Sequence, residues 1–80
     1  MNITLIQGSY APAEALELVS KMIAEKIRFQ ENKIHKSSNE EDIKMRETRI
    51  KALQNEFAAI KSIIGTRAGL ISINSTIEIS

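Results

Sequence analysis

The stretch IKMRETRIKALQNEFAAIKSII, residues 43–64, decides the fold. Its heptad positions form two interleaved series, one of Ile43, Ile50, Phe57 and Ile64 and the other of Arg46, Leu53 and Ile60. This a/d pattern, which only Arg46 interrupts, is typical of a helix that packs along its length against another helix. Ala52, Ala59 and Ile63 widen the apolar stripe. We therefore predict a long helix over residues 39–64.

The residues around this helix predict how it begins and ends. Ser38 and Glu41 have the spacing of a capping box, in which each side chain bonds the backbone N–H of the other residue. The residues at 37 and 40 have the same spacing, so the start is defined to within one residue. At the other end, Gly65 is suited to position C′, just beyond the last turn.

The chain before residue 36 predicts another long helix, over residues 12–35. Pro12 suits a first turn, because the N–H that proline lacks would be unpaired there anyway. One apolar stripe contains Leu16, Val19, Ile23, Ile27 and Ile34, and a second stripe beside it contains Leu18, Met22 and Phe29. An apolar face of this width can contact more than one neighbouring helix.

A short loop between two long helices predicts an antiparallel hairpin. If the chain folds back near residue 37 or 38, Leu53 lies opposite Met22 or Ile23. Arg46 then lies level with Phe29 and Gln30, and Gln30 is the polar gap in the main stripe of the first helix. We predict that these two residues form a polar layer that sets the register and the choice of partner.

The two ends of the chain predict strands. ISINSTIEIS, residues 71–80, alternates between apolar and polar residues, so we predict a strand over residues 70–79 with one apolar face made of Ile71, Ile73, Ile77 and Ile79. A shorter strand is predicted over residues 2–7, with Ile3 and Leu5 on its apolar face and Gly8 as its end. Because the hairpin brings its two open ends together, the strands should pair antiparallel, and the longer one should overhang.

These elements predict a single α+β domain over residues 1–80, predominantly α, in which paired terminal strands flank a long helical hairpin. Two helices are too thin to bury two apolar stripes, so we expect a second copy to complete a dimeric four-helix bundle. The expected oligomer interface consists of Leu16, Val19, Ile23, Ile27, Ile50, Leu53, Phe57 and Ile60.

The composition also favours an oligomer. Eighty residues form a small domain that is marginally stable alone, and the absence of cysteine excludes disulfides. No apolar run approaches the roughly 18 residues of a membrane span, and the N-terminus lacks the basic leader of a signal peptide. We expect a soluble, cytoplasmic protein that does not contact membranes.

The central half of the chain is basic. The stretch from Lys26 to Lys51 contains eight basic and five acidic residues, although the net charge of the chain is only +1. Such a region could bind phosphates, but the interleaved glutamates favour a solvated, salt-bridged face. The candidates for partner binding are Arg28, Lys33, Arg46 and Arg49.

The sequence offers little catalytic chemistry. His35 is the only histidine; with Glu31 and Glu41 or Asp42 it could bind a divalent metal, but a histidine at a helix C-terminus more simply complements the helix dipole. One histidine and no cysteine leave no convincing nucleophile–base pair. We expect no catalytic residues, cofactor or metal.

The function that we expect is therefore a non-enzymatic, oligomeric structural or protein–protein interaction module. Its main partner would be a second copy of itself, with another protein as a further candidate. The alternative is a nucleic-acid-binding or regulatory protein that uses the basic distal half of the hairpin.

Overall fold

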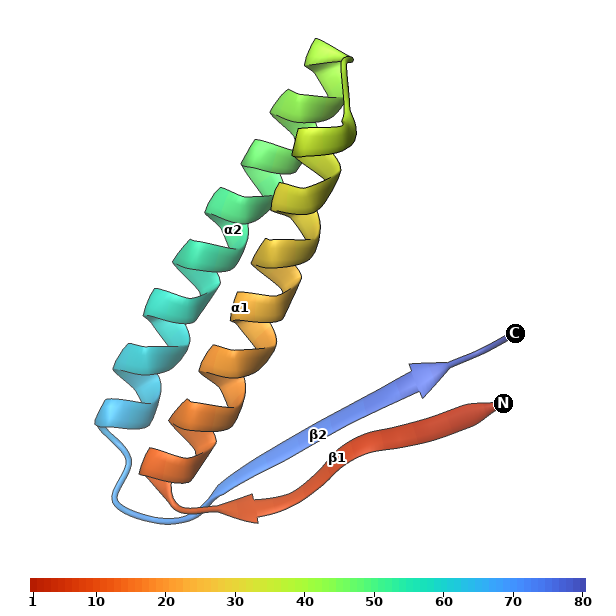
Figure 1. The fold of residues 1–80 in the computed structure, drawn as a ribbon. Helices are drawn as coiled ribbons and strands as arrows, with labels where there is room; N and C mark the ends of the chain where they lie inside the picture. The colour runs from red at the N-terminus through yellow and green to blue at the C-terminus, as the bar shows by residue number, and fades with distance from the viewer.

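The computed structural model of residues 1–80 confirms the α+β class, with mostly helical content. The order along the chain is β1 (Asn2–Tyr10), α1 (Pro12–Lys36), α2 (Glu40–Gly65) and β2 (Ile71–Glu78). Figure 1 shows α1 and α2 side by side as a hairpin, with both strands leaving its open end as one ribbon. The ends of each helix lie within one residue of the predicted ends.

A polar contact joins the helices at the level where the predicted register places it. Nη1 of Arg46 donates a hydrogen bond to Oε1 of Gln30 at 2.8 Å, and its Nε donates to Oδ2 of Asp42 at 3.2 Å. The Arg46 side chain is only 18% exposed. The same offset places Ile23 opposite Leu53, and both residues are buried. One register therefore accounts for both the polar layer and the apolar contact.

The start of α2 differs from the prediction. Oδ1 of Asn39 accepts hydrogen bonds from the backbone N–H groups of Glu41 and Asp42, at 2.9 and 3.1 Å. The predicted capping box is wrong because Asn39, which ranks among the best N-cap residues, lies directly before the first turn in an extended conformation. The hydroxyl of Ser37 instead accepts a hydrogen bond from the Asn39 N–H, at 3.2 Å. It thereby supports the connection between the helices.

The end of α2 also differs from the prediction. Gly65 is the last residue of the helix, and no residue of the chain has a positive φ. Thr66 follows in a right-handed conformation, and its backbone N–H bonds the carbonyls of Ile63 and Ile64. Its hydroxyl also donates to the Ile63 carbonyl, at 2.8 Å. The C′ role predicted for Gly65 is therefore wrong, because Thr66 already satisfies the last turn.

The strands pair antiparallel, as predicted, but β1 is longer than expected. It continues through Gly8 to Tyr10, which lies opposite Ile71. Gly8 does not end the strand because its backbone pairs with β2 and the Tyr10 side chain packs over it, with the hydroxyl 3.5 Å from where a Cβ would lie. At the far end, Met1 and Ile79 exchange two hydrogen bonds of 2.7 Å. The predicted overhang of β2 is therefore wrong.

A β-bulge changes which residues of β1 face which side. The register shifts between Thr4 and Ile6, so Leu5 is the extra residue. Ile3 lies opposite Ile77, and Ile6 lies opposite Ser75. Directly opposite residues of an antiparallel pair share a face, so Ile3 and Ile6 lie on the same face as the β2 isoleucines. The predicted position of Ile3 on this face is confirmed, and the bulge adds Ile6 to it. Leu5, the extra residue, lines a hollow against Met22 of α1.

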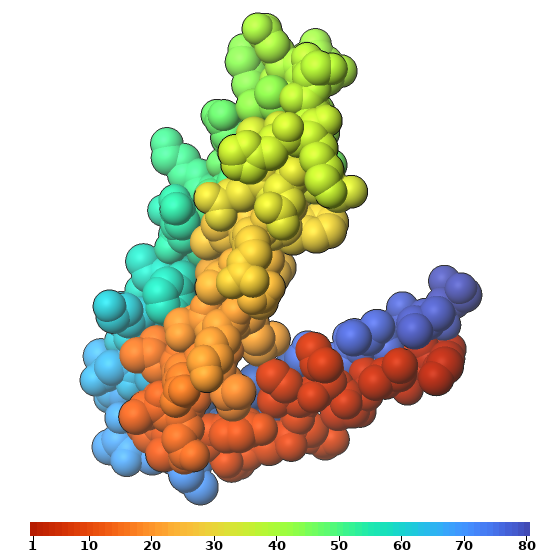
Figure 2. Space-filling view, viewed as in Figure 1, coloured from red at the N-terminus to blue at the C-terminus, as the bar shows by residue number.

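The molecule forms a single layer. Its Cα atoms span 46 × 33 × 13 Å, and only Ala15, Ile23, Leu53 and Ile64 are buried. In Figure 2 the hairpin and the ribbon diverge from a common base, with open space between them. Stable domains usually bury their apolar surfaces between at least two packed layers. This chain alone supplies one layer.

Candidate functional site

An apolar surface, half-buried at Leu18 and Met22 and exposed elsewhere, runs along one side of the hairpin. From α1 it contains Leu18, Met22 and Phe29, and from α2 it contains Met45, Ala52, Ala59 and Ile63. We call these seven residues the hairpin face. Their spacings of four and seven place them on one stripe of each helix. Phe29 is 56% exposed and Ile63 is 55% exposed. A hollow lined by Lys26 and Gln30 of α1 and Ala52 and Glu56 of α2 joins the two stripes.

The ribbon carries a second apolar surface. One face contains Ile3, Ile6, Ile71, Ile73 and Ile77, together with the terminal pair Met1 and Ile79. We call these seven residues the ribbon face. Near the base of the molecule its isoleucines are half-buried, whereas Ile77 is 42% exposed. The ribbon therefore becomes more exposed with distance from the hairpin.

The two faces meet at the base of the molecule. Ile63 of the hairpin face and Ile71 and Ile73 of the ribbon face line one apolar groove, together with Val19, Ile60 and Ile64. Farther along the ribbon, Leu5 and Met22 line a second shallow hollow between β1 and α1. The hairpin face and the ribbon face thus join in one apolar groove at the base of the molecule.

The accessible area of the chain is large for its mass. It is 6215 Å², whereas a compact folded monomer of 8.9 kDa exposes about 4,800 Å². The radius of gyration is 15.2 Å, compared with about 12 Å for a compact domain of this length. The excess area is about 1,400 Å², and a standard protein–protein interface buries about 800 Å² per partner. The chain thus exposes more than enough surface for a stable interface.

The structure places the predicted interface residues along the contact between α1 and α2. Ile23 and Leu53 are buried within the single chain, and the other six are half-buried: Leu16, Val19, Ile27, Ile50, Phe57 and Ile60. The most exposed large apolar side chains lie outside this set. Two of them belong to patterns that are visible in the sequence. Phe29 lies on the second apolar stripe of α1, and Ile77 lies in the alternating pattern of β2. Met45 is absent from the predicted stripe, although it lies seven residues before Ala52 and so continues the stripe of Ala52, Ala59 and Ile63.

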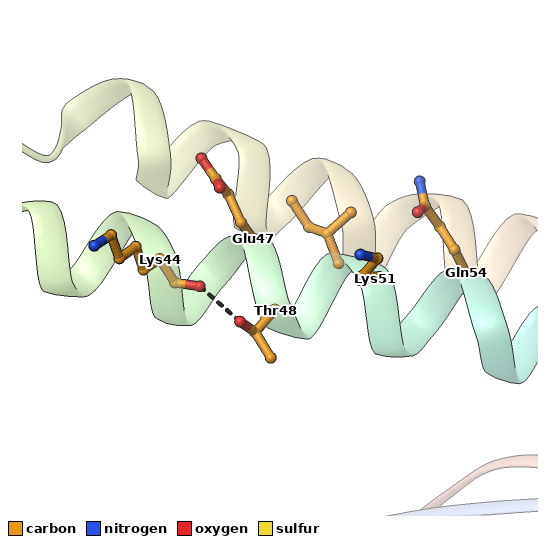
Figure 3. Close-up of a pocket in the computed structure, with 6 residues that line it drawn as sticks. Lys44, Glu47, Thr48, Lys51 and Gln54 are labelled. Carbon is orange, nitrogen blue, oxygen red and sulfur yellow. Dashed lines mark hydrogen bonds between the residues drawn. The ribbon is translucent and has the colours of Figure 1, made fainter.

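The predicted partner-binding cations are not gathered into one site. Arg28 pairs with Glu25 on its own helix at 3.0 Å, and Arg46 is engaged inside the hairpin. Nζ of Lys33 lies 5.5 Å from the centroid of the Phe29 ring. Arg49 lines the hollow that joins the two helices. The largest hollow of the distal half, on α2, mixes both signs of charge, as Figure 3 shows for Lys44, Glu47 and Lys51.

The acidic residues near the hairpin tip have structural roles. Asp42 accepts the hydrogen bond from Arg46, and a hydrogen bond with the Ser37 side chain is the largest of the causes that lower the pKa of Asp42 below its ordinary value. No three His, Asp or Glu side chains converge as a metal site would require. His35 lies in the last turn of α1.

No protein family matches this chain, and neither a curated protein nor a solved structure is significantly similar to it. Neither helix combines the length and the apolar character that crossing a membrane requires.

Proposed function

We propose that this protein is a non-enzymatic structural or protein–protein interaction module that works as a homodimer. The observation that carries the proposal is the area of about 1,400 Å² that the chain exposes beyond the expectation for a compact monomer. An 80-residue chain without cysteine has few other means of stabilising such a surface. Association with a second copy would add the missing layer.

Helix packing supports a four-helix bundle as the form of the dimer. The hairpin has apolar side chains on a stripe beyond the contact between its own helices, and Phe29, Met45 and Ile63 remain exposed there. Two hairpins that pack through such stripes bury them on both sides. The polar layer at Arg46 and Gln30 would then favour one register of association.

Sedimentation equilibrium of the wild-type chain across the micromolar range tests the proposal. A homodimer has twice the 8.9 kDa mass of the chain. Circular dichroism at each concentration reports whether folding and association occur together. A well-folded monomer throughout that range would overturn the proposal. The cytoplasmic location that we propose is tested separately, by fractionation of the host cell.

The alternative is nucleic-acid binding through the basic distal half, where Lys44 and Lys51 lie within one hollow. A titration with mixed-sequence DNA and RNA at increasing salt concentration tests it. Binding that several lysines and arginines carry would weaken steeply as salt rises. We expect no such binding, because Arg46 is occupied and Arg28 is paired with Glu25. Tight, salt-sensitive binding would favour the alternative.

A further inference from the structure

We infer that a second copy of this chain covers the hairpin face and the ribbon face together, so that one dimer interface spans both arms of the molecule. This inference rests on the proposed function, because it names the surface through which the dimer forms. It also goes beyond a four-helix bundle, since a bundle alone would leave the ribbon uncovered.

The continuity of the two faces is the first argument. Ile63 belongs to the hairpin face, and it lines the same groove as Ile71 and Ile73 of the ribbon face. Leu5 and Met22 line a second hollow between the arms. Any partner that packed on the hairpin near Ile63 would therefore also contact the ribbon.

The area is the second argument, and it favours a second copy as the occupant. The excess of about 1,400 Å² is larger than the 800 Å² or so that each partner buries in a standard interface. Obligate homodimers bury larger and more apolar surfaces than transient complexes do. A single-layer chain that buries only four of its residues needs a partner of that kind in order to fold stably. A second copy is always present where the chain is made.

Charge is compatible with self-association. The two subunits of a twofold dimer bring the same surface to each other, so a strongly charged surface would repel itself. The chain carries a net charge of only +1, and the side chains of both faces are apolar. The hollow between the two hairpin stripes contains charges of both signs, from Lys26, Arg49 and Glu56. Self-pairing would therefore bury apolar atoms without bringing a strongly charged surface of one sign against itself.

The ribbon provides the sharpest experiment, because its two faces differ in polarity. Ile77 lies on the ribbon face, and its neighbour Thr76 points to the other side of the same strand. We expect Ile77→Lys to raise the dimer Kd about 100-fold or more, as an unpaired charge in an apolar interface should. Thr76→Lys is the matched control and should change the Kd by less than about threefold.

The hairpin provides a second matched pair. Ile63→Glu places a charge on the hairpin face, and Gln54→Glu places the same charge on the opposite side of α2. We expect Ile63→Glu to raise the Kd about 100-fold or more, and Gln54→Glu to leave it within about threefold of the wild type. All four variants are measured by sedimentation, with circular dichroism as the check on folding.

The outcomes separate the inference from the proposed function. If the wild type dimerises and Ile77→Lys behaves like Thr76→Lys, the ribbon lies outside the interface and the inference is overturned, while the proposed homodimer stands. If Ile63→Glu behaves like Gln54→Glu, the hairpin face lies outside the dimer interface. The inference is then also overturned, while the proposed homodimer stands. A wild-type chain that stays monomeric overturns both.

Cysteine labelling tests the same interface without a charged substitution, so it still applies if a charged variant fails to fold. The chain has no cysteine, so each single variant carries one thiol: Ile63→Cys, Ile77→Cys, Gln54→Cys or Thr76→Cys. Both isoleucines are exposed in the isolated chain, and dimerisation should cover them. Maleimide labelling should therefore slow at least about tenfold at positions 63 and 77 as the concentration passes the dimer Kd, but not at positions 54 and 76. A labelling rate at position 77 that does not depend on concentration would overturn the inference.

Discussion

The helical hairpin and the β-ribbon are built from similar aliphatic residues, but they bury them very differently. All four buried residues of the chain, Ala15, Ile23, Leu53 and Ile64, belong to the helices. The ribbon buries none of its residues. Two helices that lie side by side press their apolar stripes together, whereas two paired strands join by their edges and leave both faces open. Pairing within the chain therefore provides the hairpin with a small core and the ribbon with hydrogen bonds alone.

The two regions therefore differ in how much they depend on packing against another layer. A two-stranded ribbon is marginal in water unless another layer covers its apolar face. An exposed strand rich in isoleucine also invites edge-to-edge pairing with other chains. The hairpin can keep its register through Leu53 and Arg46, but the ribbon depends on what it packs against. The following predictions test that contrast.

The largest effect should come from the buried side of the hairpin. Leu53→Asp places an unpaired charge at a position that is only 8% exposed, so it should cost more than about 4 kcal/mol and unfold the chain. Urea denaturation followed by circular dichroism measures the loss. Gln54→Asp, at the exposed neighbouring position, is the control and should cost less than about 1 kcal/mol. Equal effects at the two positions would contradict the assigned register.

Removal of β2 should affect association more than helix content. A chain that ends at Gly69 retains both helices but leaves β1 without a partner. We expect a helical far-UV spectrum, a lower Tm and a dimer Kd at least about 100-fold higher than that of the wild type. Sedimentation and thermal melting provide both measurements. A truncated chain that stays dimeric and equally stable would show that the ribbon is a passive tail.

The loss of stability from mutating the polar layer should depend on whether one or both of its two residues are replaced. Gln30→Ala leaves the guanidinium of Arg46 without one of its two acceptors inside the hairpin, which should cost about 1–3 kcal/mol. The double variant Gln30→Leu with Arg46→Met removes both polar groups and should be nearly neutral in stability. It should also relax the choice of register and broaden the distribution of oligomers. Additive losses in a double-mutant cycle would mean that the two residues do not interact.

The N-cap of α2 should have a smaller and local effect. Asn39→Ala removes the acceptor for two backbone N–H groups and should cost about 1 kcal/mol. The side chain of Ser38 makes no hydrogen bond within the chain, so Ser38→Ala should be nearly silent. Chemical denaturation of both variants distinguishes this arrangement from the capping box that the sequence predicts. A larger loss for Ser38→Ala than for Asn39→Ala would favour the capping box.

The smallest effect should be a dependence of stability on acidic pH. Bonding with Ser37, and to a lesser extent with Arg46, lowers the pKa of Asp42 in the folded state below its ordinary value of 3.8. Its contribution to stability is therefore fully present well above pH 3.8 and is lost as the pH falls through the lowered pKa. Asp42→Asn should lower the Tm slightly at neutral pH and converge with the wild type in strong acid. A constant difference in Tm across the acidic range would exclude this linkage.

Local backbone details account for most of the differences between prediction and structure. Three polar residues in succession could each cap α2, and Asn39 became the N-cap because it lies directly before the first turn. Nothing in the residues of β1 signals the bulge at Leu5, because it arises from pairing with β2. The continuation of β1 through Gly8 likewise depends on the partner strand, which satisfies the backbone there.

The sequence alone determined two helices, two strands, the antiparallel hairpin and its register. All of these came from the periodicity of apolar and polar residues. Those properties follow from short-range geometry, since the spacing of apolar residues sets the type of element and the matched polar gaps at Gln30 and Arg46 set the alignment. Only the tertiary structure decided how the arms are arranged: as one thin layer, with the hairpin face and the ribbon face joined at the base. That arrangement depends on the path of the chain at residues 10–12 and 65–71, where two elements join at an angle. Hydrophobic spacing within either element carries no information about that angle.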